Sequence, residues 1–438
     1  MMRAIRVQWQ GAAWFDWGLT ETLKAQNQIR VASSSYTVSD VYPVGSRIKV
    51  VSNNATVYGT VTTLSTSSSA VIVDIAPDSG TVTSTVTSVA ASIIDPAGLP
   101  LPDSVTTNNP NLMINPNFQV AQLGVSFTAA TTPLNSDDTY LFDQWILLSD
   151  GNDAVDVTQE TSVVPAGSGT AIKLEVETAN KKFGLLQPLE NLDTVNLDGS
   201  ILSLSFMARN AASDDKTDVV KAVVLAWSST ADAITSDVVS AWNADLTIPT
   251  FATNWTAENT PASLTLTQVY QTFTIENINL DTASTANLAL FIWCDNADGA
   301  IDDAVYISNI KLEESVTATE YTAPLIEDDL HKAQRFLCKS FNQSVTPGTA
   351  ATVGSPYFAW TASTVQKACP IVFPITMLST PSVVAYAPSD GSSGNIDSAL
   401  TPRTAIIVRP GQNGVSVGTN DANSAQSITF HYVATSQL

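Results

Sequence analysis

Stretches in which apolar and polar residues alternate recur along this chain, and they constrain its fold more than any other feature. Alternation with a period of two places apolar side chains on one face of a β-strand. One helical pattern stands out, over residues 324–341, and the residues at helical spacing there are Leu330, Ala333, Gln334 and Leu337. We therefore expect a mainly β protein with one short helix. The alternating or apolar stretches are residues 47–51, 55–62, 70–75, 153–157, 171–177, 201–207, 219–227, 270–276, 287–293 and 305–313.

Length and proline content divide the chain into segments. A chain of 438 residues is too long for one domain. Residues 95–110 hold four prolines and little core material, which predicts a stiff, extended connection. We expect a small N-terminal β domain over 1–94, a linker over 95–111, a two-sheet sandwich over 112–315, a connector with the helix over 316–341 and a distal, C-terminal β-sandwich over 342–438.

The charge of the chain is strongly and unevenly negative. The net charge is −22, of which residues 51–340 carry −25, residues 341–438 carry 0 and residues 1–50 carry +3. Such an acidic body excludes nucleic acid as a partner. The charge favours solubility and repulsion between particles; the alternative is that the basic N-terminal segment docks on an acidic partner.

Several other classes of feature are missing from the sequence. No run of about 18 apolar residues predicts a membrane span, and the first ten residues lack the apolar core of a secretion signal. Cys294, Cys338 and Cys369 are odd in number and far apart. This spacing predicts buried thiols in a protein assembled in a reducing cytoplasm, and neither disulfides nor a metal site.

Two short motifs are specific enough to suggest a family. Residues 111–119 end an apolar run in Asn115-Pro116-Asn117, and a second motif, Phe-Asp-Gln-Trp, follows at 142–145. Together they resemble the opening of the carbohydrate-binding-module-like jelly rolls that recur in fibres and appendages of tailed bacteriophages. The stretch at 305–313 is similar to the closing strand of those jelly rolls.

The C-terminal third of the chain resembles the same proteins. Residues 327–341 are similar to a short helical element that precedes the distal domain of many phage fibres, with Phe336 where tyrosine is common. Residues 370–384 and 427–434 resemble segments of that distal domain. The resemblance implies a homotrimeric tail fibre or receptor-binding virion protein. It would attach to other virion proteins through its N-terminal domain and bind a host-surface glycan or other receptor distally. A structural fibre or decoration protein of head, collar or tail remains the main alternative. A glycan-degrading enzyme and a bacterial carbohydrate-binding protein are the others.

Aromatic side chains are the candidate binding residues, because flat rings stack on the apolar faces of sugars. Trp242 and Trp255 fall in loop-like segments, and Tyr357 and Trp360 lie in the distal domain. We take these four as candidate glycan-binding residues, with partial burial as the alternative. Three strand tryptophans are expected in the core, and four N-terminal aromatics form either a small core or a virion-attachment surface. The core group is Trp145, Trp227 and Trp293, and the N-terminal group is Trp9, Trp14, Phe15 and Trp17.

The sequence offers no convincing catalytic or metal-binding set. His331 and His431 are the only histidines, no Gly-x-Ser-x-Gly elbow is present, and no spacing selects a carboxylate pair. We expect a binding protein without a cofactor. The resemblance leaves room for a structural calcium near Asn115-Pro116-Asn117, although Ser308-Asn309 stand where an acid would lie. The loop from Cys294 to Asp303 fails as an EF-hand, and its acids are expected in a solvated turn.

Overall fold

The alternating stretches form β-strands in the computed structural model of the chain, which is mainly β. The chain divides into two compact units, residues 1–107 and 108–438, and each is described by itself. Within the described part, no helix is long and apolar enough to cross a membrane. The residues that the structure describes are 15–16, 21–32, 42, 44, 46–52, 55–67, 70–83, 85–92, 110–212, 216–245, 247–294, 299–359, 367–420 and 427–438.

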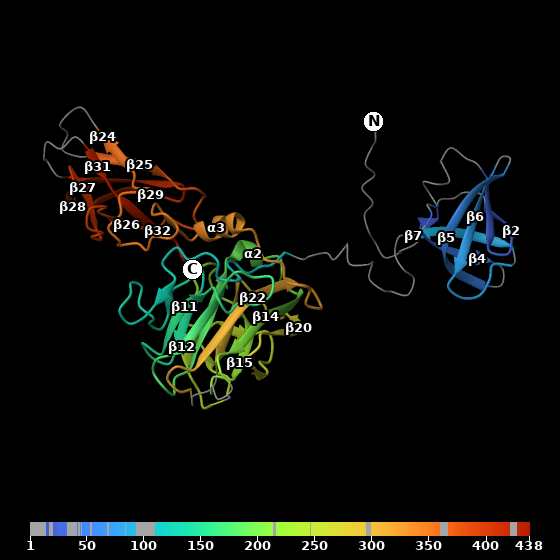
Figure 1. Cartoon of the computed structure of the whole chain (residues 1–438), viewed down its shortest axis with the longest axis horizontal. Coiled ribbons are helices and arrows are strands. Elements are labelled where there is room, and N and C mark those ends of the chain that lie inside the picture. The colour runs from blue at the N-terminus through green and yellow to red at the C-terminus, as the bar shows by residue number, and fades with distance from the viewer. Residues whose placement is uncertain are drawn as a thin grey trace. The chain divides into compact units, whose positions relative to one another are not determined.

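The first unit is one curled sheet of seven strands in the order β1–β7–β4–β5–β6–β3–β2 (Figure 1). The edge strand β2 also contacts β7, which bends the sheet toward a barrel. Alternation works as expected in β4, where every second residue is buried. Residues from Glu21 onward form the edge strand β2. The strands are β1 (Phe15–Asp16), β2 (Glu21–Ala25), β3 (Gln28–Ala32), β4 (Arg47–Ser52), β5 (Ala55–Ser67), β6 (Ala70–Pro77) and β7 (Val86–Ser92).

Residues 110–314 of the second unit form a jelly-roll β-sandwich of two main sheets. One sheet has the order β18–β15–β21–β13–β10–β9, with β19 also paired to β15, and the other has the order β20–β14–β22–β12–β11–β8. The first contains β9 (Thr139–Tyr140), β10 (Ile146–Ser149), β13 (Phe183–Leu189), β15 (Val219–Trp227), β18 (Trp255–Ala257), β19 (Leu264–Thr265) and β21 (Asn287–Cys294). The second contains β8 (Ser126–Phe127), β11 (Val155–Glu160), β12 (Ala171–Val176), β14 (Ile201–Asn210), β20 (Gln271–Asn279) and β22 (Ala304–Glu314).

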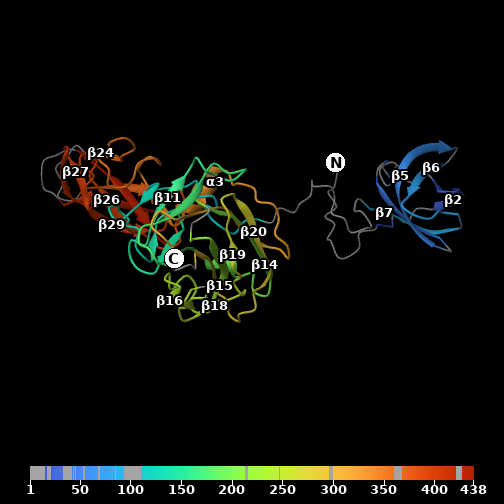
Figure 2. The ribbon, with the colours of Figure 1, turned by 60° about the horizontal axis from the view of Figure 1, so that its bottom comes forward.

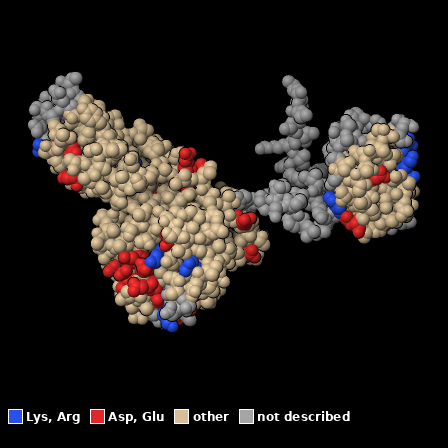
Figure 3. Space-filling view, in the orientation of Figure 1, with Lys and Arg blue, Asp and Glu red and all other residues tan. Residues whose placement is uncertain are grey.

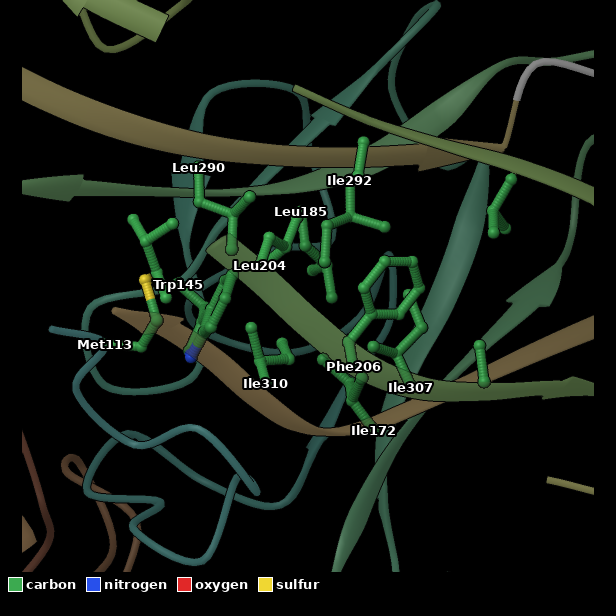
Figure 4. Close-up of a cluster of buried hydrophobic side chains, with 14 of the residues drawn as sticks. Met113, Trp145, Ile172, Leu185, Leu204, Phe206, Leu290, Ile292, Ile307 and Ile310 are labelled. Carbon is green, nitrogen blue, oxygen red and sulfur yellow. The ribbon is translucent and has the colours of Figure 1, made fainter. Parts of the chain in front are cut away.

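A large apolar core fills the space between these two sheets (Figure 4). Leu185, Leu290 and Ile292 from the first sheet face Leu204 and Phe206 from the second. Trp145 is fully buried at one end of this core, and its ring lies 5.2 Å from that of Phe118. Trp145 and Trp293 are buried completely and Trp227 almost completely, so the expected core positions are confirmed, although Trp145 lies just before β10 and not in a strand.

A second apolar cluster covers the outer face of the first sheet. Residues 228–254, which include β16 (Val239–Ala241) and β17 (Thr250–Phe251), fold over that face. Phe291 and Trp293 stack there with ring centroids 5.0 Å apart. As a result, β13 and β21 are buried along their whole length on both faces.

The predicted helix is shorter than the sequence pattern suggested. Helix α3 covers Ile326–Gln334, so the prediction of a helix running to residue 341 is wrong. Leu337 belongs instead to β23 (Leu337–Lys339), which pairs with β32 (His431–Thr435). Pairing to a buried strand outweighs the helical periodicity of this short segment. A further one-turn helix, α2 (Asn191–Thr194), was not predicted.

Three small sheets follow α3 and pack beside the jelly roll (Figures 1 and 2). Their strand orders are β23–β32–β26, β24–β31–β27–β28 and β25–β30–β29. One apolar cluster around Phe430, Ile396 and Val417 forms their common core. The remaining strands are β24 (Tyr357–Ala359), β25 (Lys367–Val372), β26 (Ser382–Tyr386), β27 (Asn395–Ser398), β28 (Thr401–Thr404), β29 (Ile406–Gly411), β30 (Gly414–Thr419) and β31 (Ser427–Thr429).

Candidate functional site

A cleft of about 840 Å³ opens where loops of the jelly roll meet the C-terminal sheets. We call it the junction cleft. Jelly-roll residues from β8, the following loop and β9 form one side, and residues from β23, β26, β32 and two turns form the other. The residues that line it are Leu123, Ser126, Phe127, Thr131, Thr132, Pro133, Asp138, Thr139, Tyr140, Leu337, Thr346, Pro347, Gly348, Thr349, Val384, Tyr386, Gly391, Ser393, Val433, Thr435 and Gln437.

The base of the junction cleft is apolar. Leu123, Leu337 and Val433 belong to one small hydrophobic cluster that joins the jelly roll to the C-terminal sheets. Tyr386 packs on this cluster, and its ring meets that of Phe341 edge to face at 5.6 Å. Burial raises the pKa of the Tyr386 hydroxyl, so it stays protonated and able to donate a hydrogen bond.

Tyr140 anchors the jelly-roll side of the junction cleft. Its hydroxyl donates to the main-chain oxygen of Leu438 at 2.8 Å, which connects β9 to the segment after β32. Nearby, Ser236 donates to the Asp138 carboxylate at 3.2 Å, and the Ser149 amide donates to Asp137 at 2.7 Å. Loss of water contact, together with the neighbouring Asp237, raises the pKa of both carboxyl groups.

The loop of residues 346–349 forms the rim, and two contacts hold it in place. The Lys339 ammonium donates to the carbonyl of Val345 at 2.8 Å, just before the loop. On the other side, Gly391 approaches so closely that an added Cβ would lie 2.0 Å from the carbonyl oxygen of Gly348. Gly391 also has a φ of +76°, so only glycine satisfies both demands.

A buried polar network supports this rim from below. Gln122 donates to Asp143 from its main-chain amide at 2.8 Å and from its side chain at 2.6 Å, and it also donates to the Leu337 carbonyl at 2.7 Å. Lys339 donates to the carbonyl of Gln122 at 2.6 Å. Burial raises the pKa of Asp143 and lowers the pKa of Lys339 to about 8, although each charge favours the other. Jelly roll and C-terminal sheets are therefore tied together by groups out of contact with water.

The Asn-Pro-Asn-Phe motif supports the same junction. Asn115 is fully buried, and its main-chain amide donates to the Asp329 carboxylate of α3 at 2.8 Å. Its side chain exchanges hydrogen bonds with the main chain of Val120, and its carbonyl accepts from the Trp145 indole at 3.0 Å. Arg335, just after α3, pairs with Glu190 at 2.5 Å. The sequence motifs that suggested a family thus hold α3 against the sandwich.

The proposed glycan-binding aromatics do not gather in one place. Trp255 is buried against Trp227, with ring centroids 5.1 Å apart, and its indole donates to the Thr235 carbonyl, so its ring faces are not open to a sugar. Trp242 is half-buried and packs near Phe291 at 6.1 Å. Tyr357 is 65% exposed on β24 and remains a candidate, while Trp360 lies outside the described residues.

The attachment role of the four N-terminal aromatic residues stays a prediction. Trp9, Trp14 and Trp17 lie outside the described residues. Phe15 is in β1 and pairs with Ala91 of β7. The predicted linker falls almost entirely outside the described part as well.

The two histidines and the described acids of the 294–303 loop lie in different surroundings. His431 is buried, stacks on Phe341 at 3.9 Å, and contacts the Ser340 hydroxyl and the Ala351 carbonyl, each at 3.0 Å. His331 lies exposed on α3. Asp302 is exposed, as expected of a solvated turn. Asp303 is buried and accepts amide hydrogen bonds from Lys216 and Ala300, so the expectation of a solvated turn is wrong for this residue. Among the residues that the structure describes, no group of three or more His, Cys, Asp or Glu could hold a metal ion. The three cysteines are buried, and none of them forms a disulfide.

No protein-family model and no curated protein matches the chain. Among solved structures, TmCBM61 in complex with β-1,4-galactotriose is 14% identical at a TM-score of 0.28, covering 47% of this chain and 99% of its own. The enzymatically active domain of bacteriophage CBA120 tailspike protein 4 is 14% identical at a TM-score of 0.25, covering 39% of this chain and 19% of its own. A xylan-binding domain from family 22 of the carbohydrate-binding modules is 11% identical at a TM-score of 0.26, covering 42% and 95%.

Proposed function

We propose that this chain binds a glycan in the junction cleft and does not transform it. The observation that carries the proposal is the lining of the cleft, which combines an apolar base and two tyrosines with many hydroxyl groups. A hydroxyl both donates and accepts, which suits a ligand covered with hydroxyls of its own. Aromatic and aliphatic surface at the base suits the apolar faces of sugar rings.

We further propose that the protein belongs to the virion of a tailed bacteriophage, as a fibre or receptor-binding protein. The motifs at 111–119, 142–145 and 327–341 support this placement by resemblance. With several copies on one particle, many weak contacts would act together and give tight attachment to a host surface. The resemblance also implies a homotrimer, and light scattering of the purified chain at three times its monomer mass of 46.3 kDa would support it.

The decisive experiment compares two tryptophan substitutions on an array of bacterial surface glycans. Ser393→Trp places an indole in the junction cleft, whereas Thr272→Trp places one on the exposed edge strand β20. We expect Ser393→Trp to weaken binding by at least about tenfold, roughly 1.4 kcal/mol, and Thr272→Trp to leave it unchanged. Equal binding by both variants would show that the glycan site lies outside the junction cleft. If the unsubstituted chain binds no glycan, the proposal of glycan recognition is rejected.

A further inference from the structure

The junction cleft contains almost no charge. Among the described residues that line it, Asp138 carries the one carboxylate, and no Lys, Arg or His is present. The polar groups are otherwise hydroxyls, the Gln437 amide and main-chain atoms. Nothing in this lining compensates a negative charge on a ligand, and burying an unpaired charge is costly.

Two further carboxylates near Asp138 make the cleft still less suitable for an anion. Asp137 and Asp237 lie close enough to Asp138 to act on it electrostatically. Lys339 supports the rim, but its ammonium donates to three carbonyls below the loop, and Asp143 compensates its charge. It therefore offers no free donor to a ligand.

The whole second unit repels anions. Residues 1–107 hold six Lys or Arg and seven Asp or Glu, so of the 19 and 41 in the chain residues 108–438 hold 13 and 34, a net charge of −21. Figure 3 shows Asp and Glu gathered on the jelly roll, while the surface of the C-terminal sheets in the same view is mostly uncharged. Such a field lowers the local concentration of polyanions, and salt weakens the effect.

We infer that the ligand of the junction cleft is a neutral glycan, whose units carry hydroxyls but no carboxylate, sulfate or phosphate. This inference rests on the proposed glycan-binding function. Asp138 suits such a ligand, since a carboxylate accepts hydrogen bonds from sugar hydroxyls. The same group repels a carboxylate placed on the sugar ring.

The test uses pairs of oligosaccharides that differ only in charge. Glucose, galactose and mannose oligomers are compared with the matching uronic acid oligomers, with the full-length chain at 50 mM and 500 mM salt. For a pair that binds, we expect the neutral oligosaccharide to bind at least about tenfold more tightly than the uronic acid oligomer at low salt. This difference in affinity should become smaller at high salt, because salt screens the repulsion. The Asp138→Asn variant should also show a smaller difference in affinity between the neutral and the acidic oligosaccharide at low salt.

Glu276→Gln is the matched control for Asp138→Asn. It removes the same charge from β20, whereas β8, which lines the cleft, lies at the opposite edge of the same sheet. It should leave the selectivity unchanged. A uronic acid oligomer could bind as tightly as its neutral counterpart or more tightly, with that binding blocked by Ser393→Trp. This result would overturn the inference of a neutral ligand and leave the junction cleft as the binding site. If no neutral or acidic glycan binds, including those on the broader array, the proposed glycan-binding function itself is overturned.

Discussion

At the scale of single residues, the buried pair of Asp143 and Lys339 matters most for the second unit. Both side chains are more than nine-tenths buried, and together with Gln122 they connect the jelly roll to β23. A buried charge is tolerated only when it is paired and hydrogen-bonded. The two residues should therefore be intolerant of separate replacement.

We predict that Asp143→Asn lowers the free energy of unfolding of residues 108–438 by about 3 to 5 kcal/mol, because it leaves the Lys339 charge uncompensated. Urea denaturation followed by tryptophan fluorescence measures the loss. Glu327→Gln, on the exposed face of α3, serves as the control and should change stability by less than about 0.5 kcal/mol. A loss below about 1 kcal/mol for Asp143→Asn would show that the network carries little stability.

Gly391 and Gly394 form a natural matched pair for the rim of the junction cleft. Both have positive φ, at +76° and +74°, but a Cβ on Gly394 would meet nothing within 4 Å. We predict that Gly394→Ala costs about 1 to 2 kcal/mol from backbone strain alone, and that Gly391→Ala costs clearly more and weakens glycan binding. Equal losses of stability for the two variants would show that the rim adapts to the added methyl group.

At the scale of elements, the β11–β12 ladder places like charges side by side. Asp156 pairs with Glu175 across the ladder, and Asp153 and Glu177 lie near. Partial burial and these three acids raise the pKa of Asp156 to about 6 from its ordinary value of 3.8. A raised pKa means that the folded state holds the proton more firmly than the unfolded state, so stability falls as the pH rises through this window.

We predict that Asp156→Asn stabilises the second unit at pH 7.5, by less than about 1 kcal/mol because the site is partly exposed. The advantage should shrink as the pH falls from 6 to 4 and disappear below 4, where the carboxyl is protonated in both states. Thermal melts of both proteins across this range provide the measurement. An advantage that stays constant with pH would point to packing instead of charge.

The hairpin between β27 and β28 has an unfavourable turn sequence. Ser398 pairs with Thr401, and the two turn residues between them, Ala399 and Leu400, have φ values of +48° and +64°. Such turns favour Asn-Gly, because other residues are strained in the left-handed region. We predict that the double change Ala399→Asn and Leu400→Gly raises stability by about 1 kcal/mol or more. Leu400→Ala keeps the strained backbone and should give no such gain.

Patterns of hydrophobicity predicted most of the long strands but not every element. Period-two alternation located β4, β12, β14 and β20 within a few residues. It missed β13, because residues 228–254 cover the outer face of its sheet and leave no polar face to alternate with. It overextended α3, because the pairing of Leu337 with Thr435 depends on a strand almost a hundred residues away.

The junction cleft could not be predicted for a related reason. Its lining comes from segments that are far apart in the sequence, such as Thr131, Thr349 and Thr435. Each is an ordinary hydroxyl residue in a loop or on a strand, and no local spacing marks it. Trp255 looked like a binding residue because its surroundings are polar in sequence, yet residues packed around it in space bury it.

At the scale of the whole molecule, the two units should behave as independent folding units, whereas the second unit should not divide further. We predict that a fragment of residues 108–438 is folded, shows the same melting transition as in the full chain and retains glycan binding. Fragments 108–315 and 316–438 should be unstable, because Asp329 and Lys339 lose their partners Asn115 and Gln122. Folding of 316–438 alone, seen by circular dichroism and a cooperative melt, would contradict this prediction.

The buried network that connects Gln122 and Asp143 to Lys339 also limits which segments of the chain can be exchanged with those of a related protein. If the C-terminal sheets alone were exchanged at a boundary near residue 315, a strand from another protein would replace β23. The buried polar groups of the jelly roll would then lose the hydrogen-bond partners that β23 provides. A crossover near residue 107 would carry the sandwich, α3 and the C-terminal sheets together, with every buried charge still facing its partner. Hybrid proteins with altered binding range should therefore arise more readily by replacement of residues 108–438 as one block.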